Sequence, residues 1–349
     1  MIPVAVLGAT GAVGQRFIQL LDGHPYFRVA EVVASGRSAG QRYADAATWR
    51  LPTPLPEDVG ALVVKPLDAA LDSPLAFSAL PVEAAGEVED RLADAGHVVS
   101  TNARSHRMDP DVPLLVPEVN WAHLQAVEAQ RARRRSNGFI VANPNCSTIV
   151  LALTLKPLHD GFGLTQVMVT TLQALSGAGY PGVSSMDIID NVQPYIGSEE
   201  DKLESEPRKI LGSWGRGDET GFVEAPITVS ANCNRVATTD GHLECVSVAF
   251  AHAATHDDVE AALRDYRSPL LALGLPSAPD PAIVVRDEPD RPQPRLDRDA
   301  GRGMAVSVGR LRPCPILAYK FVALGHNTIR GAAGGAILNA ELLHAKGYV

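Results

Sequence analysis

The sequence predicts an α/β protein with an N-terminal Rossmann-like, doubly wound parallel sheet, followed by an α+β domain with a mixed sheet. Short apolar strands alternate with helix-like segments over the first third. A glycine-dense turn follows the first strand, and longer β-rich stretches dominate after residue 146. A chain of 349 residues is long enough for two buried cores. We place the domains at 1–145 and 146–327, and we expect the C-terminal helix, 328–349, to pack back on the first.

The alternation over the first domain is typical of βαβ units. Such units form a parallel sheet with helices on both faces. A helix is also expected over 121–137, and its basic end, 131–135, is interpreted as a solvent-exposed face. The other expected elements are strands at 4–7, 28–34, 61–64, 76–80 and 97–100, and helices at 12–21 and 82–93.

The second domain has a different rhythm, which indicates a mixed or antiparallel sheet. A helix is expected at 257–266. The segment 277–302 is rich in Pro, Asp and Arg, so we expect an exposed loop or hairpin in which only 282–286 forms a strand. A small-residue helix is expected at 331–343. The expected strands lie at 165–174, 227–231, 243–252, 304–310 and 316–323.

The composition argues against several classes of protein. A net charge of -9 is unlike the basic face of a nucleic-acid binder. No run of about 18 apolar residues occurs, so no membrane span is expected. The four cysteines show neither C-x-x-C pairing nor zinc-like spacing with histidines, so we expect no disulfide framework and no metal site. Because the chain runs straight into a strand without a leader-like pattern, the predicted compartment is the cytoplasm.

The turn over residues 8–14 has the spacing G-x-x-G-x-x-G and lies between the first strand and the first helix. Glycines permit a tight turn and close approach of the backbone to a pyrophosphate, and the helix N-terminus supplies N–H groups for the anion. A turn with a purely structural role is the alternative. We predict a dinucleotide site with contacts from Gly8, Thr10, Gly11, Ala12 and Val13.

The end of the second strand indicates which dinucleotide is bound. An NAD site has an acidic residue there, about 20 residues beyond the turn, to bind the ribose 2′-OH. This chain instead has Ser35, Arg37 and Ser38, which would attract a 2′-phosphate. The predicted cofactor is therefore NADP.

Cys146 lies in the stretch Asn-Pro-Asn-Cys-Ser-Thr, directly before the apolar run 149–155. A polar turn that opens a helix places the thiol where unpaired backbone N–H groups converge. The helix dipole favours an anion there, and such thiols can titrate several units below the free value of roughly 8.5. Cys146 is thus a candidate nucleophile, and a small buried apolar residue is the alternative.

Two more motifs accompany these. Residues 173–182 form a glycine-dense turn after a strand, and 234–244 contain an arginine and a histidine. With 8–14 and 143–147, they resemble the aspartate-semialdehyde dehydrogenase family, particularly its archaeal and fungal branch. The likeness follows the order of nearly the whole chain and extends to 100–108, 191–212 and 326–343.

This resemblance implies an oxidoreductase that uses NADPH to reduce L-4-aspartyl phosphate to L-aspartate 4-semialdehyde, with release of phosphate. The pathway leads to lysine, threonine and methionine. Family members have two-domain subunits, so 146–327 is expected to serve catalysis and dimerisation in a homodimer or homotetramer.

The resemblance also implies catalytic roles. Cys146 would attack the acyl phosphate and form a thioester, which divides one difficult reaction into two easier ones. His242, with an unperturbed pKa near 6.5, would move the proton as the thiohemiacetal forms and collapses. Gln173 would orient the intermediate or a hydrolytic water near the cysteine. The alternatives are a structural histidine and a plain strand-end amide.

The family's substrate-binding residues map onto charged positions. Arg235 would grip the α-carboxylate with its guanidinium fork. Glu199, or Glu200, would pair with the α-ammonium, although a solvated helix face also explains 199–202. The phosphate would be held by Lys202 and Arg107, with Arg104 as a competitor of Arg107. Ser176, Gly177 and Asn327 would border the nicotinamide. Two positions depart from the family pattern: Ala237 replaces a frequent proline, and His106 a frequent tyrosine.

Four other functions are compatible with parts of this pattern. Malonyl-CoA reductase shares the thioester chemistry but acts on a substrate without an α-amino group, so a glutamate placed for an ammonium favours the aspartyl substrate. N-acetyl-glutamyl-phosphate reductase is more distant. A cofactor-free Cys–His hydrolase would leave the glycine turn unexplained. A non-catalytic NADP-binding regulator would be expected to have lost some of Cys146, Gln173, Arg235 and His242.

Overall fold

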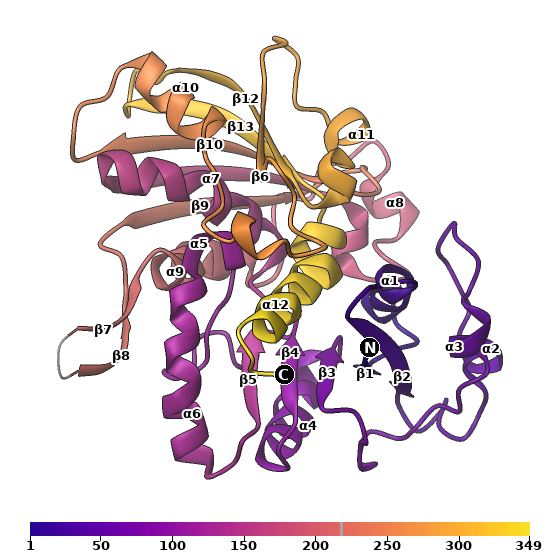
Figure 1. Ribbon diagram of the computed structural model, residues 1–349. Coiled ribbons are helices and arrows are strands. Elements are labelled where there is room, and N and C mark those ends of the chain that lie inside the picture. Colours follow the sequence, from indigo (N-terminus) through magenta and orange to yellow (C-terminus); the bar gives the residue numbers. More distant parts are fainter. Residues whose placement is uncertain (217–218) are drawn as a thin grey trace.

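The first sheet has five strands, all parallel, in the order β2-β1-β3-β4-β5 (Figure 1). It belongs to a computed structural model that describes residues 1–216 and 219–349. Strands β3, β4 and β5 are buried along their whole length, as expected for a parallel sheet covered on both faces. The strands are β1 (Ile2–Leu7), β2 (Phe27–Val33), β3 (Leu75–Ser78), β4 (Val98–Thr101) and β5 (Phe139–Ala142).

Helices cover both faces of this sheet because successive strand residues point to opposite sides. Ala5 and Leu7 share a core with α4, whereas Val4 and Val6 share another with α1 and α12. Helix α12, at the end of the chain, therefore packs on the first sheet, whose strands lie at the beginning of the chain (Figure 1). The helices here are α1 (Ala12–Leu21), α2 (Tyr43–Ala46), α3 (Glu57–Gly60), α4 (Val82–Asp94), α5 (Pro117–Asn120), η1 (Trp121–Gln125), α6 (Ala126–Arg134) and α12 (Gly334–Ala345).

The second sheet is mixed, with six strands in the order β11-β12-β13-β10-β6-β9. Its end pairs, β11–β12 and β6–β9, are parallel and the other pairs are antiparallel. Helices α7 and α10 share a core with it, and α9 lies beside β9. The strands are β6 (Leu164–Gln173), β9 (Thr228–Arg235), β10 (His242–Phe250), β11 (Ile283–Arg286), β12 (Val306–Pro313) and β13 (Tyr319–Gly325).

The remaining elements connect these layers. A two-stranded sheet is formed by β7 (Ser213–Arg216) and β8 (Glu219–Val223). The helices are α7 (Cys146–Phe162), η2 (Leu175–Ala178), α8 (Ser185–Ile188), α9 (Glu199–Ile210), α10 (His256–Arg264), η3 (Leu271–Leu273), α11 (Pro294–Asp297), η4 (Ala300–Gly303) and the π-helical turn η5 (Ile329–Ala333). Within the described ranges, no helix is both long and apolar enough to cross a membrane.

One expectation about the fold is wrong, and two others are correct only in part. Residues 61–64 contain one isolated bridge, between Val63 and Arg42, rather than a strand, and Val63 is 58% exposed. The basic end of α6 is a solvated face at Arg133 and Arg135, as expected, but the Arg134 side chain is buried between Asp90 and Asp94. The segment 277–302 is not merely an exposed excursion. Its strand β11 (Ile283–Arg286) confirms the strand expected at 282–286, but the segment also contains a buried carboxylate, Asp297, which pairs with arginines.

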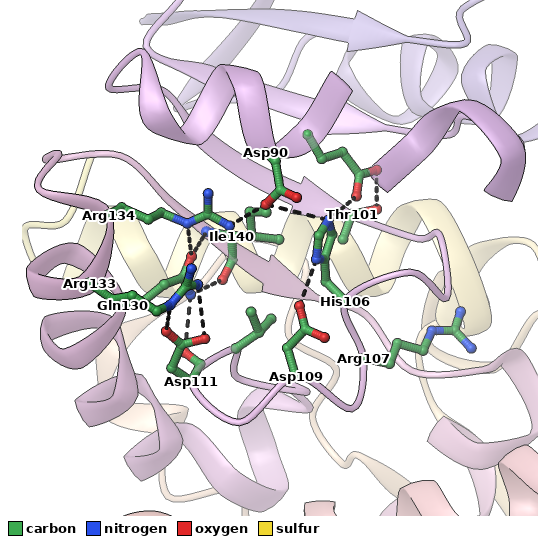
Figure 2. A network of polar contacts seen from close by, with 12 residues as sticks. Asp90, Thr101, His106, Arg107, Asp109, Asp111, Gln130, Arg133, Arg134 and Ile140 are labelled. Atoms are coloured by element: carbon green, nitrogen blue, oxygen red, sulfur yellow. Dashed lines mark hydrogen bonds and ion pairs between the residues drawn. The ribbon is translucent and has the colours of Figure 1, made fainter. Parts of the chain in front are cut away.

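His106, which replaces a frequent tyrosine, lies in a buried polar network between α4 and the loop after β4 (Figure 2). Its Nδ1 is 2.8 Å from Asp109, and its Nε2 is 3.7 Å from Glu89 and 4.0 Å from Asp90. Burial alone would lower the pKa of His106, but the three carboxylates raise it above its usual value. Burial raises the pKa of Glu89, whose carboxyl accepts a hydrogen bond from Thr101.

The stability should therefore depend on the charge of His106. Since the native pKa of His106 exceeds the unfolded value of about 6.5, its contribution is fully present below that pH and is lost as pH rises through the native pKa. Glu89, whose pKa is raised too, acts in the same direction. His106→Gln should reduce the free energy of unfolding by roughly 1–2 kcal/mol at pH 5.5 and by less at pH 8.5. Denaturant unfolding at both pH values checks this, and a larger loss at pH 8.5 would contradict it.

Candidate active site

A cavity of about 630 Å³ lies between the first sheet and the second domain, and it joins the N-terminus of α1 to the start of α7. The structure brings most of the predicted site residues together at its wall. These are Gly11, Ala12, Val13, Arg107, Cys146, Gln173, Ser176, Gly177, Glu199, Lys202 and Asn327. Arg235 and His242 are buried directly behind Gly177, where an added Cβ would lie 2.7 Å from Arg235 Nη1 and 3.1 Å from His242 Cε1.

Helix α7 begins at Cys146, as predicted. Asn145 caps it: the side-chain oxygen of Asn145 accepts hydrogen bonds from Ser147 N at 2.9 Å and Thr148 N at 3.2 Å. The Cys146 sulfur lies at the cavity wall, 3.1 Å from His242 Nε2. A thiol and an imidazole from distant segments are therefore in contact.

The surroundings of the Cys146 thiol in the ligand-free protein oppose the predicted lowering of its pKa. Burial raises the pKa of Cys146 to about 12, and the Glu199 carboxylate acts in the same direction. The nearby cationic side chains oppose these effects without outweighing them. The helix N-terminus still favours an anion, but desolvation of the enclosed sulfur dominates.

The proton on His242 is placed by a backbone contact. Ala174 N donates a hydrogen bond to His242 Nδ1 at 3.0 Å, so Nδ1 carries no proton. Burial lowers the pKa of His242 to about 3, with Arg235 adding to the effect, and the ring is neutral. Its single proton is then on Nε2, which faces the sulfur. His242 is therefore oriented to donate a hydrogen bond to Cys146.

Gln173 and Arg235 lie side by side because β6 and β9 pair in parallel with these two residues in register. Arg235 is 5% exposed, and its Nη1 donates to the carbonyl of Ala174 at 2.7 Å. Gln173 is buried, and its amide donates to Glu199 at 3.2 Å. Neither is a plain surface residue.

Glu199, and not Glu200, borders the cavity. Its carboxylate is 2.6 Å from Lys202 Nζ and accepts hydrogen bonds from the Asn145 amide. Burial opposes ionisation, but Lys202 and the amide donors hold the pKa of Glu199 below its usual value. Glu200 instead accepts from Cys233 N on β9. A solvated helix face is excluded for Glu199, which is 8% exposed.

Both arginines that are candidates for binding the phosphate border the cavity, but they differ in burial and in hydrogen-bond partners. Arg107 is buried, and its Nη1 donates to Glu206 at 2.9 Å. Arg104 is exposed, and its Nη1 donates to the Ser198 hydroxyl at 2.8 Å. Sequence reasoning did not single out Glu206, because no local motif marks it.

The N-terminus of α1 fits an anionic cofactor. Its cap, Gly11, provides no side-chain oxygen, and the first turn has no acidic residue, so its amides remain available to a phosphate. A Cβ at Gly14 would overlap the Gly8 carbonyl oxygen, so glycine is required there. Asn327 connects two segments of the second domain, η2 and the turn before β10: it donates to the Ser176 hydroxyl at 2.7 Å and accepts from Gly241 N at 2.8 Å.

Ser35, Arg37 and Ser38 follow β2 at the same edge of the sheet as this turn. Ser35 and Arg37 are exposed, and none of the three borders the cavity. Gly8 and Thr10 also lie outside the cavity wall. Among the described residues, no cluster of three or more His, Cys, Asp or Glu side chains could hold a metal ion.

Comparison with known proteins shows to which family the chain belongs. Residues 3–127 match the model of the semialdehyde dehydrogenase NAD binding domain, and residues 155–330 match that of the semialdehyde dehydrogenase dimerisation domain. The chain is 50% identical to the aspartate-semialdehyde dehydrogenase of Archaeoglobus fulgidus, with 97% of each chain covered. It belongs to the aspartate-semialdehyde dehydrogenase family. The predicted resemblance is thereby confirmed.

Two other members of the family are similar to this chain over their whole length. The aspartate-semialdehyde dehydrogenase of Methanothermobacter thermautotrophicus is 50% identical, with 99% of each chain covered. The crystal structure of the Candida albicans enzyme with NADP is 46% identical, covers 100% of both chains and superposes with a TM-score of 0.93. The predicted fold class and enzyme class are confirmed, and the cofactor-free hydrolase is set aside by the NAD binding domain.

Proposed function

We propose that the chain reduces L-4-aspartyl phosphate to L-aspartate 4-semialdehyde with NADPH, through a thioester on Cys146. The observation that carries this is the single cavity in which the N-terminus of α1, the Cys146–His242 contact and the Glu199–Lys202 pair meet. It provides an anion site for a dinucleotide, a nucleophile, and both signs of charge for an amino-acid phosphate.

NADP is the proposed cofactor, as in the solved Candida albicans relative. The first-turn amides at Ala12 and Val13 would hold the pyrophosphate, and Ser176 and Asn327 would border the nicotinamide. Ser35, Arg37 and Ser38 place no acidic group where a 2′-phosphate would lie. When bound, NADPH supplies the hydride that reduces the acyl group.

The free protein holds the substrate-binding charges as a pair. Glu199 and Lys202 neutralise each other, and a substrate with an ammonium and a phosphate would replace each partner. Arg235 uses Nη1 for Ala174, so its other guanidinium N–H groups would hold the α-carboxylate. Arg107 would complete the phosphate site. A substrate without an ammonium, such as malonyl-CoA, would leave Glu199 without this partner.

Substrate binding would also activate the nucleophile. An ammonium beside Glu199 would neutralise a carboxylate that raises the pKa of Cys146, so the thiol would give its proton more readily to water in the cavity and leave a sulfur anion. The sulfur anion would then attack the acyl carbon, and the bond to the phosphate oxygen would break with its electron pair leaving on phosphate.

His242 would act in this reaction as a donor. Its Nε2–H can stabilise the sulfur anion and then the oxygen that becomes negatively charged. Because the acyl group enters and the aldehyde leaves with the sulfur as an anion, His242 does not need to accept a proton. We therefore propose that His242 donates a hydrogen bond, in place of the proton transfer that the resemblance implies.

The proposed assembly is a homodimer or homotetramer, and the proposed compartment remains the cytoplasm. The second domain matches the family's dimerisation domain. Alternate residues of β6 leave one face of its sheet open, with Met168 49% exposed. A second copy of the chain is the expected partner for that face.

The decisive measurement is reduction of NADP by aspartate semialdehyde in the presence and absence of inorganic phosphate. We expect turnover that requires phosphate and a higher kcat/KM with NADP than with NAD. NADPH oxidation by malonyl-CoA, with none by aspartyl phosphate, would replace the proposed function with malonyl-CoA reduction.

A further inference from the structure

Glu206 is a buried carboxylate that binds two unlike groups at the edge of the cavity. It is 2% exposed, and none of the roles above uses it. Oε1 accepts from Arg107 Nη1 at 2.9 Å, and Oε2 accepts from the backbone N–H of Asn145 at 2.8 Å. One side chain therefore connects a phosphate-binding candidate to the residue that precedes the nucleophile.

Helix α9 presents two carboxylates to the same turn. Glu199 and Glu206 are seven residues apart, which places them on one face of the helix two turns from each other. Both hold Asn145: Glu199 accepts from its side-chain amide, and Glu206 accepts from its backbone N–H. Since Asn145 also caps α7, the position of Cys146 depends on these contacts.

Arg107, the other partner of Glu206, is also held in place by two hydrogen bonds. Arg107 Nη2 donates to the carbonyl of Asn102 at 2.8 Å, while Nη1 is held by Glu206. The ion pair between Arg107 and Glu206 is almost wholly excluded from solvent. An arginine held from two sides has little freedom to move, so its placement relative to the Cys146 turn is set before any substrate binds.

We propose that Glu206 is a positioning residue, which fixes the separation between the nucleophile and the guanidinium that holds the leaving phosphate. This inference depends on the proposed function. Attack on an acyl phosphate requires the sulfur, the carbonyl carbon and the phosphate to be held in one arrangement, and small displacements cost rate. Glu206 acts through Arg107 and Asn145 and does not contact the substrate.

The test is Glu206→Gln, assayed by phosphate-dependent NADP reduction with aspartate semialdehyde. Glutamine keeps the volume but has one acceptor oxygen in place of two, so one donor loses its partner. A lost hydrogen bond to a charged group predicts a rise in the KM for inorganic phosphate of about tenfold and a fall in kcat of about tenfold. The KM for aspartate semialdehyde should change less than twofold, because Arg235 and Glu199 are untouched.

Glu204→Gln is the matched control. Glu204 lies on the same helix and accepts one backbone hydrogen bond, from Ala231 N on β9, away from the cavity. Its loss should leave both kinetic constants near the wild-type values. Equal losses in Glu204→Gln and Glu206→Gln, in step with a lowered Tm, would show a structural role only and overturn the proposal.

Two more variants separate the remaining outcomes. Arg107→Lys should raise the KM for phosphate, and adding Glu206→Gln to it should raise that KM no further if Glu206 acts through Arg107. Glu206→Asp keeps the charge but has a side chain one methylene shorter, so the KM for phosphate should rise less than in Glu206→Gln. If Glu206→Gln does not fold, Glu206→Asp provides the test. Wild-type values in a folded Glu206 variant would refute the positioning role. Absence of phosphate-dependent turnover in the wild-type protein would refute the proposed function instead.

Discussion

Cys146→Ser should lower turnover by roughly 10³-fold or more, the loss expected when the nucleophile of a covalent mechanism is removed. Serine retains the shape of the site, but its hydroxyl is a far weaker nucleophile than a thiolate at the same place. Binding of NADP should be unchanged, because the first turn of α1 lies at the other end of the cavity. Steady-state kinetics and NADP titration by fluorescence check the two statements.

Cys314→Ser is the control for this prediction. Cys314 is a free, partly exposed thiol that follows β12 and accepts a hydrogen bond from Leu317 N, outside the cavity wall. Its replacement should leave turnover at the wild-type level. If Cys146→Ser retained a tenth or more of wild-type turnover, a thioester on Cys146 would no longer be tenable.

His242→Ala should lower kcat by about 10²–10³-fold, the usual loss when one donor to a developing anion is removed. His242→Gln should recover a substantial part of this loss, because the glutamine amide can present an N–H near the position of Nε2. A donor role predicts this rescue, since Nδ1 is occupied by the Ala174 N–H and the ring has no need to take up a proton.

A proton-transfer role predicts the opposite for glutamine, which cannot exchange a proton near neutral pH. Equal kcat values for the alanine and glutamine variants would therefore favour general acid–base catalysis by His242. The pH profile gives an independent check. We expect kcat/KM of the wild-type protein to rise with pH as the thiol ionises, with no acidic limb near pH 6.5, because the pKa of His242 is lowered to about 3.

The parts of the site that local sequence encodes were predictable. The glycine turn lies between β1 and α1, and α7 begins at Cys146, because glycine spacing and a capping asparagine act within a few residues. The sequence left the choice between Glu199 and Glu200 open, since both precede Lys202 at plausible spacing. The packing of α9 against β9 decides between them: it turns Glu199 into the cavity and Glu200 toward β9.

The ionisation of Cys146 could not be predicted, because it depends on segments distant in the chain. The π-helical turn η5 lies directly against it: an added Cβ at Gly331 would be 2.6 Å from the Cβ of Cys146. His242 and Glu199 come from two further elements. Glu206 was missed for the same reason, since it meets Asn145 across 61 residues of sequence. Long-range packing sets desolvation, and desolvation outweighs the helix N-terminus here.

Helix α12 supplies side chains to the core of the sheet that begins the chain, so the cofactor-binding half is not made from one continuous stretch. During synthesis one apolar face of this sheet is covered only in part, by α1, until residues 334–345 have left the ribosome. A fragment ending before the second domain would lack that cover and would be prone to aggregate. The first domain therefore completes its folding only after the second domain has been synthesised.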